Sequence, residues 1–228
     1  GFRVPDIENK YFYVWLDAPL GYVAASTEWA ADKGLTTEDL WQSENTRIEH
    51  IIGKDIVYFH TLFWPSILKS IGYTLPSKVH VHGMLTVGGE KMSKSRGTFI
   101  TARQYLDHFD PDLLRYYFAT KLSPHIDDID LNLEEFAQKM NSDLVGKVVN
   151  IASRCAKFIN KNFDNKLAVL NDENQTHYNA ALEKLPAIQE AFNNFELGKG
   201  CRLIMQIADE ANRLIDELKP WVTMKEEG

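Results

Sequence analysis

The fold class is decided by residues 49–82, which read EHIIGKDIVYFHTLFWPSILKSIGYTLPSKVHVH. The stretch opens with the strand-like run Glu49–Ile52 and closes with a second one, Lys78–His82. The 55–71 segment between them is predicted to be helical. This strand–helix–strand order indicates a parallel sheet of the α/β type.

Local signals refine that connection. Gly53 closes the first run, and Asp55 is a plausible N-cap for the helix that follows. Pro65 should kink or divide the helix, and Gly72 should end it. One carboxylate at Asp55 can cap a helix and also accept hydrogen bonds from a ligand, so both roles stay open.

Two further elements are expected before residue 49. The aromatic and β-branched run Phe12–Leu16 is typical of a buried strand and ends at Asp17-Ala18-Pro19. Residues 21–32 should form a helix that stops at Gly34.

The second half changes character. Gly88-Gly89 lies between extended runs and predicts a hairpin, and Asp110-Pro111 predicts the start of a helix that reaches Lys121. From Leu133 onward, apolar residues recur at three- and four-residue spacing, which indicates a helical bundle. One later helix should span 172–195, with an interruption near Pro186. Another should carry the apolar pattern from Leu197 to Leu218 and stop at Pro220.

Composition and charge set broad limits. The chain has 228 residues, 44% of them hydrophobic and 25% charged, which is ordinary for a globular protein. No apolar run approaches the roughly 18 residues that cross a bilayer. There is no start methionine, so a fragment is expected, and the two cysteines form no Cys-x-x-Cys pair that would suggest zinc. These features favour a cytoplasmic protein.

The net charge of −7 argues against nucleic-acid binding, but its distribution does not. Residues 137–166 carry six basic side chains against two acidic ones, so one face could bind a polyanion. The acidic run 127–130 lacks a convincing metal-ligand pattern, and we interpret it as solvated and capping.

The strongest chemical signal is Lys91-Met92-Ser93-Lys94-Ser95, flanked by Gly88, Gly89 and Gly97. Glycines let a backbone approach a ligand closely, and paired ammonium groups neutralise phosphate oxygens. An exposed basic loop is the alternative for two lysines near a glycine.

In every position, this pentapeptide is identical to the KMSKS signature loop that class I aminoacyl-tRNA synthetases carry. The resemblance implies that the loop closes over ATP, brought as its magnesium complex. Lys94 then stabilises the departing pyrophosphate, with Lys91 and Ser93 beside it.

Two other segments, Trp15–Tyr22 and Gly53–Pro65, closely resemble those of methionyl-tRNA synthetases. A thioether favours an apolar, polarisable surrounding, which aromatic rings provide. The resemblance implies a methionine pocket formed by Trp15, Ala18, Pro19, Tyr22, Phe59, His60 and Trp64. The alternative is that these rings are core and that His60 is a hydrogen-bonded core histidine; Phe63 is expected in the core in either case.

The same resemblance implies further contacts. Adenosine would lie near Gly53, Asp55, His82 and Gly83. The tRNA anticodon would be read by Asn150 and Arg154, which share one helix face, and by Trp221, on which an unpaired base can stack. A hydrophobic residue packed on the bundle is the alternative for Trp221.

The implied architecture is α/β: the second half of a Rossmann-like parallel sheet followed by an α-helical bundle. Residues 1–84 would belong to the catalytic core, 85–140 to the KMSKS loop and a connecting region, and 141–228 to the anticodon-binding domain. The His-x-Gly-His motif of class I enzymes does not occur here, and zinc is expected only in an insertion outside this chain.

The implied function is ATP-dependent ligation of L-methionine to tRNA(Met) through a methionyl-adenylate, with this chain inactive alone. A non-catalytic tRNA-binding module and a relative specific for another apolar amino acid are the alternatives. The resemblance also allows a homodimer formed through segments outside this chain; no membrane partner is expected.

Overall fold

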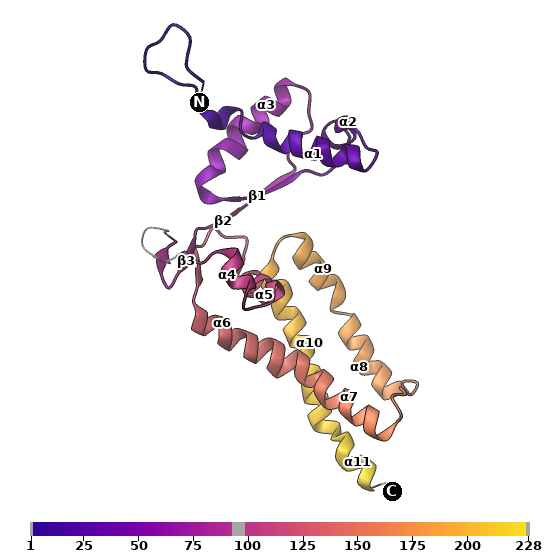
Figure 1. Ribbon diagram of the computed structural model, residues 1–228. Coiled ribbons are helices and arrows are strands. Elements are labelled where there is room, and N and C mark those ends of the chain that lie inside the picture. The colour runs from indigo at the N-terminus through magenta and orange to yellow at the C-terminus, as the bar shows by residue number, and fades with distance from the viewer. Residues whose placement is uncertain (1, 93–98, 227–228) are drawn as a thin grey trace. The chain divides into compact units, whose positions relative to one another are not determined.

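A computed structural model of the protein describes residues 2–92 and 99–226. The chain divides into two compact units, Gly1–Gly83 and Met84–Gly228, and each is described by itself (Figure 1). A two-stranded parallel sheet and a three-stranded mixed sheet are followed by long helices, which confirms the expected α/β class. The finer division at residue 141 stays a prediction.

The first unit is built on two parallel strands, β1 (Glu49–Gly53) and β2 (Lys78–His82). Their register pairs His50 with Val79 and Gly53 with His82, so both strands end at the same edge. The connection between them is helical, as predicted, and consists of η2 (Lys54–Ile56), η3 (Phe59–Phe63) and α3 (Trp64–Ser70).

The predicted effect of Pro65 appears as a change of helix type: the π-helical η3 gives way to α3 just before the proline, and the backbone stays helical across it. A π-helical turn precedes the proline, and the Trp64 N–H donates to the Phe59 carbonyl five residues back. Gly72 follows α3 with a φ of 75°. The predicted Asp55 N-cap is wrong: Gly53 holds the extended N-cap position without a side-chain cap, and Asp55 lies inside the first turn.

Two helices precede the strands: α1 (Leu20–Asp32), followed by Gly34 with a φ of 69°, and α2 (Thr37–Trp41). The core of this unit consists of Trp41, Trp64 and Leu68, and Val23 and Tyr73 are among the side chains that pack around it.

The strand predicted at 12–16 is wrong, because Val14–Leu16 form a short 3-10 helix, η1. Phe12 and Tyr13 are 53% and 64% exposed, and the bridge between Arg3 and Tyr11 is the one β-pairing in the described part of residues 1–20. Aromatic and β-branched residues suit a pleated surface, but a strand also needs a hydrogen-bonding neighbour.

The second unit opens with a small mixed sheet in the order β4-β3-β5. Strand β3 (Leu85–Val87) pairs antiparallel with β4 (Glu90–Lys91) and parallel with β5 (Ile129–Leu131). Gly88 and Gly89 have φ of 61° and 80°, so both positions of the tight turn need positive φ, and the predicted hairpin is confirmed.

Helices form the rest of this unit. Asp110 caps α5 (Pro111–Lys121) by accepting from the Asp112 N–H, as predicted. Tyr117 of α5 is the centre of a core with Leu131, Phe136 and Met140. The remaining helices are α4 (Ala102–Leu106), α6 (Leu133–Lys139), η4 (Met140–Val149), α7 (Asn150–Asn162), α8 (Asp172–Leu182), α9 (Leu185–Asn193), α10 (Leu197–Leu218) and α11 (Pro220–Glu226).

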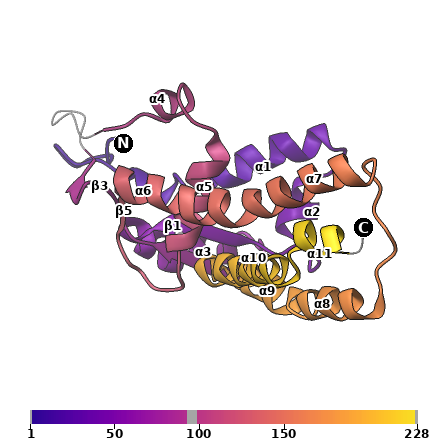
Figure 2. The same ribbon diagram turned by 90° about the horizontal axis from the view of Figure 1, so that it is seen from below.

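The bundle is organised around α10, which packs against α5, α9 and η4. Figures 1 and 2 show α6, η4 and α7 continuing into one another as a single long rod that crosses α10. The predicted interruption near Pro186 is confirmed, because α9 begins beside it. So is the stop before Pro220: Lys219 ends α10 with a φ of 42°, and Pro220 begins α11.

Candidate functional site

The first candidate site is a pair of hydrogen-bonded rings in the first unit. The Tyr22 hydroxyl lies 2.9 Å from His60 Nε2, and His60 Nδ1 lies 2.9 Å from the Ile56 carbonyl oxygen. A carbonyl oxygen only accepts, so Nδ1 carries a proton and donates it to Ile56, and Nε2 is the atom that bonds to the Tyr22 hydroxyl. The His60 side chain is fully buried, and these two hydrogen bonds fix the orientation of its ring.

His50 belongs to the same cluster, and sequence reasoning missed it. Its Nε2 accepts a hydrogen bond of 3.1 Å from the Trp64 indole N–H. Its ring lies 5.1 Å from Tyr22 and 5.2 Å from His60. Burial, and then the nearby His60, lower the pKa of His50. The alternation of Glu49–Ile52 could have identified it, since His50 and Ile52 point to the same buried face.

A second group of rings adjoins the first. Phe59 stacks on Trp15 at 5.1 Å between ring centroids, and it also contacts Tyr13 and Phe63. Phe63 is 46% exposed, so its expected place in the core is wrong. The predicted pocket rings thus fall into two groups, Tyr22, His60 and Trp64 in one and Trp15 and Phe59 in the other, which are joined along the chain at Phe59 and His60.

The other two predicted pocket residues, Ala18 and Pro19, lie just before α1. Pro19 is buried and precedes its first residue, whereas Ala18 is exposed and donates its N–H to the Val14 carbonyl.

The four residues predicted for adenosine lie together at the carboxyl edge of the sheet. Gly53 and His82 are register partners, and Gly83, which is buried, follows His82 directly. A Cβ on Gly53 would lie 2.8 Å from Asp55 Oδ1 and 3.9 Å from His82 Cε1. The carboxylate can approach the strand end this closely only because residue 53 has no side chain. Ligands in open α/β sheets bind at this edge.

The lysine motif is only partly within the described residues. Lys91 ends β4 and its side chain is exposed. The predicted contacts Ser93 and Lys94 lie outside the described residues.

The second unit carries the predicted anticodon residues on neighbouring helices. The Arg154 guanidinium lies over the Trp221 ring, 4.9 Å from its centroid, and the Trp221 side chain is 37% exposed. Asn150 donates to Asn212 Oδ1 at 3.0 Å. The structure thus brings Arg154 and Trp221 into contact, and it places Asn150 one turn earlier on the helix of Arg154.

Three polar pairs fix this arrangement, each joining residues 62 positions apart on the rod and on α10. They are Lys147–Asp209 at 2.7 Å, Asn150–Asn212 at 3.0 Å and Arg154–Asp216 at 2.5 Å. A constant separation means that the two helices run in the same direction at this contact.

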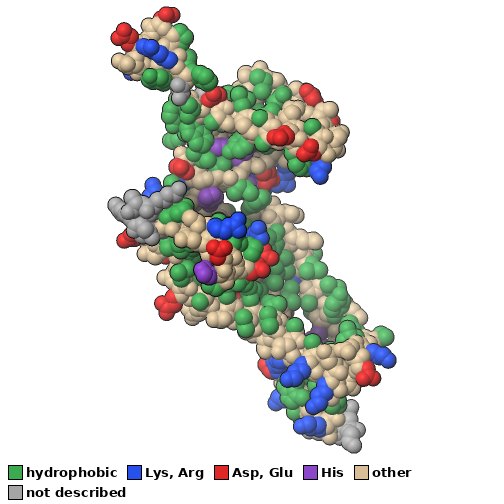
Figure 3. Space-filling view, in the orientation of Figure 1, with side chains coloured by type: hydrophobic (Ala, Val, Ile, Leu, Met, Phe, Trp, Pro, Cys, Tyr) green, Lys and Arg blue, Asp and Glu red, His purple; other side chains and the backbone are tan. Residues whose placement is uncertain are grey.

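A groove of about 540 Å³ opens beside Arg154 and Trp221. Four of its lining residues are basic and none is acidic; the basic ones are Arg154, Lys157, Lys161 and Lys225. Phe158 adds a second ring. Figure 3 shows the Lys and Arg side chains gathered at this end of the unit. Positive charge beside exposed rings suits a single-stranded nucleic acid.

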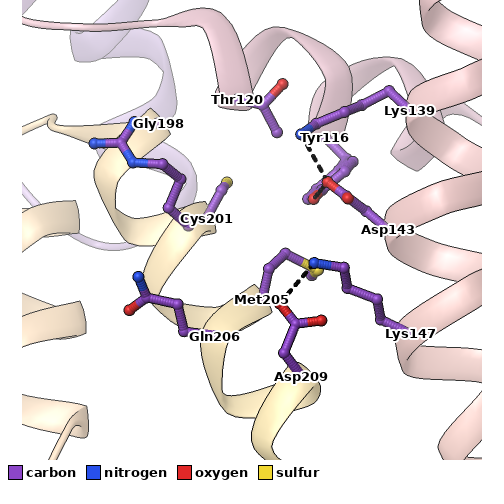
Figure 4. Close-up of a pocket in the computed structure, with 11 residues that line it drawn as sticks. Tyr116, Thr120, Lys139, Asp143, Lys147, Gly198, Cys201, Met205, Gln206 and Asp209 are labelled. Atoms are coloured by element: carbon purple, nitrogen blue, oxygen red, sulfur yellow. Dashed lines mark hydrogen bonds and ion pairs between the residues drawn. The ribbon is translucent and has the colours of Figure 1, made fainter. Parts of the chain in front are cut away.

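A separate polar cavity of about 340 Å³ lies between α5, η4 and α10 (Figure 4). Inside it, Asp143 accepts from the Tyr116 hydroxyl at 2.7 Å and pairs with Lys139 at 2.9 Å. Burial opposes the charge of Asp143, but the bonds from Lys139 and Tyr116 lower its pKa. Burial, and then Asp143, raise the pKa of Tyr116. Each acidic side chain in this cavity is paired with a basic one, Asp143 with Lys139 and Asp209 with Lys147. Such mutual neutralisation is typical of a structural network.

Neither a metal site nor a membrane span is found in the part of the chain that the structure describes. Residues 2–92 and 99–226 hold no group of three His, Cys, Asp or Glu side chains that could bind a metal ion. Among the same residues, no helix is long and apolar enough to cross a membrane.

Comparison with known proteins identifies the family. Residues 1–156 match the family described as tRNA synthetases class I (M). Methionine--tRNA ligase 1 of Sorangium cellulosum (strain So ce56) is 51% identical over 226 residues, and the match covers 99% of this chain and 32% of that protein. Methionine--tRNA ligase of Francisella tularensis subsp. tularensis (strain WY96-3418) is 53% identical over 233 residues, covering 100% and 34% respectively.

The fold agrees with a solved structure. Mycobacterium tuberculosis methionyl-tRNA synthetase in complex with methionyl-adenylate matches with a TM-score of 0.79 and 27% identity, over 97% of this chain and 43% of that one. The chain spans about a third of the length of the curated relatives. The chain therefore belongs to the class I methionyl-tRNA synthetase family.

Proposed function

We propose that this chain acts in the ATP-dependent ligation of L-methionine to tRNA(Met) through a methionyl-adenylate. The observation that carries the proposal is the Tyr22–His60 ring cluster. His60 belongs to the helical connection that follows Gly53, and Gly53 lies at the carboxyl edge of the sheet. The relatives are methionine--tRNA ligases, and the solved relative holds methionyl-adenylate. The cytoplasm is the proposed compartment.

The ring cluster suits the methionine side chain. Sulfur–aromatic contacts contribute about 0.3–1.5 kcal/mol each. Trp15, Tyr22 and Phe59 would supply such contacts, with Ala18, Pro19, His60 and Trp64 completing the pocket. The hydrogen bonds to Tyr22 and Ile56 hold the His60 ring in one orientation, so it can form part of the wall of an apolar pocket.

The carboxyl edge of the sheet suits the nucleotide. Asp55 is exposed next to a glycine and can accept ribose hydroxyl hydrogen bonds. His82 and Gly83 would lie against adenine, and Lys91, Ser93 and Lys94 would contact the phosphates of magnesium-bound ATP.

In the second unit, the proposal assigns anticodon reading to Asn150, Arg154 and Trp221. The basic groove supports this assignment, because single-stranded loops are recognised by stacking and by phosphate contacts. A tRNA-binding module without catalysis needs only this groove, so it is the second candidate.

The test is methionine-dependent ATP–pyrophosphate exchange by the protein encoded in the full reading frame that contains this chain. Exchange with methionine but not with leucine or valine is the expected result; binding of tRNA without any exchange would favour the second candidate. Since the chain has no His-x-Gly-His motif, we expect no exchange from the chain by itself.

Lys94→Ala in the full-length protein tests the phosphate assignment. Loss of one charge that stabilises the transition state slows such reactions by about 100-fold to 1,000-fold. We expect that loss in kcat with little change in the KM for methionine. An exchange rate equal to that of the unmodified protein would remove Lys94 from the mechanism.

A further inference from the structure

The acidic segment Asp127–Asp130 is in contact with the hairpin that leads to the lysine motif. Asp130 Oδ1 accepts from the Gly89 N–H at 2.8 Å and from the Thr86 hydroxyl at 2.7 Å. Asp128 Oδ1 accepts from the Met84 N–H at 2.7 Å. One carboxylate therefore holds the turn of the hairpin and another holds its base.

The hairpin itself is short. β3 and β4 share only two residue pairs, Thr86 with Lys91 and Val87 with Glu90. An isolated hairpin is marginal in water, and this one is among the shortest that can form. Strand β3 also pairs with β5, and in that register Thr86 lies opposite Asp130. The backbone and the side chain of Asp130 therefore both contact the hairpin.

Gly89 is the point at which the turn enters β4. Its φ of 80° directs the chain from the turn toward Glu90 and Lys91. The N–H that Asp130 binds belongs to this residue, so the bond acts on the peptide that sets the direction of β4. The hydrogen bonds from Gly89 and then Thr86 lower the pKa of Asp130, so the acceptor is a carboxylate at neutral pH.

We propose that Asp130 is a positioning residue for Lys91: its carboxylate fixes the Gly88-Gly89 turn and thereby the direction in which β4 carries Lys91. In this proposal Asp130 acts through the turn and not through a contact with ATP. The inference rests on the proposed function only for its effect on catalysis, because the effect on the turn is a property of the chain itself.

Four variants separate positioning from mere support of the fold. Asp130→Ala removes the acceptor, Asp130→Asn keeps an oxygen at the same place, and Asp127→Ala is a matched loss of an acid three residues away. Thr86→Val removes one of the two donors and leaves a good strand residue, which serves if the alanine variant fails to fold.

The first readout is hydrogen exchange of the backbone amides of residues 88–92 in the 228-residue chain. Asp130→Ala should speed their exchange by about tenfold or more, as expected when local opening becomes easier. Exchange in α10 should be unchanged, and Asp130→Asn should restore most of the protection. Unchanged exchange at residues 88–92 in Asp130→Ala and in Thr86→Val would overturn the proposal.

The second readout is methionine-dependent ATP–pyrophosphate exchange by the full-length protein. Asp130→Ala should lower kcat by about tenfold or more while the KM for methionine stays within about twofold, because misplacement acts on the phosphate end of the site. If Asp130→Ala changed kcat and the KM for methionine equally, and Asp130→Asn did not restore them, the proposal would also be overturned. If the unmodified protein shows no activity, the proposed function fails, and the amide measurement still decides the role of Asp130.

Discussion

The sharpest test of the second unit is Trp221→Ala. The indole is 37% exposed, lies under the Arg154 guanidinium at 4.9 Å, and borders a basic groove. A base stacked on such a ring contributes about 1–3 kcal/mol, which corresponds to about 5- to 150-fold in Kd.

Loss of the indole should act on the ligand more than on the fold. Arg154 keeps its 2.5 Å bond to Asp216 when the ring is removed, and an exposed cation–π contact contributes only about 0.5–1 kcal/mol. The basic lining of the groove is unchanged, so the general attraction for RNA should persist. Trp221→Phe retains a ring and should weaken binding less than Trp221→Ala.

The assay is fluorescence anisotropy at fixed salt, with the 228-residue chain and an RNA stem-loop that carries the anticodon of tRNA(Met). Trp29→Ala is the matched control, since Trp29 is 53% exposed on α1 in the other unit. We expect a Kd that is about 5- to 150-fold weaker for Trp221→Ala and unchanged for Trp29→Ala. Equal Kd values for Trp221→Ala and the unmodified chain would refute the stacking assignment.

Two further predictions concern stability. A Cβ on Gly198 would lie 2.9 Å from the Thr120 carbonyl oxygen, so Gly198→Ala should lower the free energy of unfolding by about 1–3 kcal/mol in urea titrations. Gly21→Ala should leave the free energy of unfolding unchanged, because nothing lies within 4 Å of a Cβ at that position. Similar losses of stability in the two variants would contradict the steric explanation. The lowered pKa of His50 means that the unfolded chain binds its proton first, so stability should fall as pH drops below about 6.5. Thermal melts at pH 7.5 and 5 should show a smaller drop for His50→Gln, and equal drops would exclude His50 as the cause.

Local chemistry is what the sequence predicted well. The Gly88-Gly89 hairpin, the Asp110 cap and the change of helix type before Pro65 each follow from backbone requirements of one or two residues. The parallel pair β1–β2 also followed from local patterns, because each strand is short, β-branched and followed by glycine.

Features that depend on a distant partner were missed. The aromatic run at residues 12–16 had the composition of a strand but lacks the neighbour that a strand requires. The acidic run 127–130 was interpreted as solvated and capping, although Asp130 is bonded to residues more than 40 positions earlier. His50 went unnoticed because its importance comes from Trp64 and Tyr22, which contact it only after folding.

The missed residues share one physical role, which is to fix groups that would bind the ligand. His50 holds the indole of Trp64, Asp216 holds the guanidinium of Arg154, and Asp130 holds the turn before Lys91. Ordering a long side chain or a glycine turn costs conformational entropy, and these bonds supply that order before any ligand arrives. A site assembled in this way loses rate or affinity when a residue outside it is changed, because the binding groups remain present but are no longer held in place. Sequence motifs identify the groups that contact a ligand, whereas the residues that hold them are identified only by the distances between their atoms.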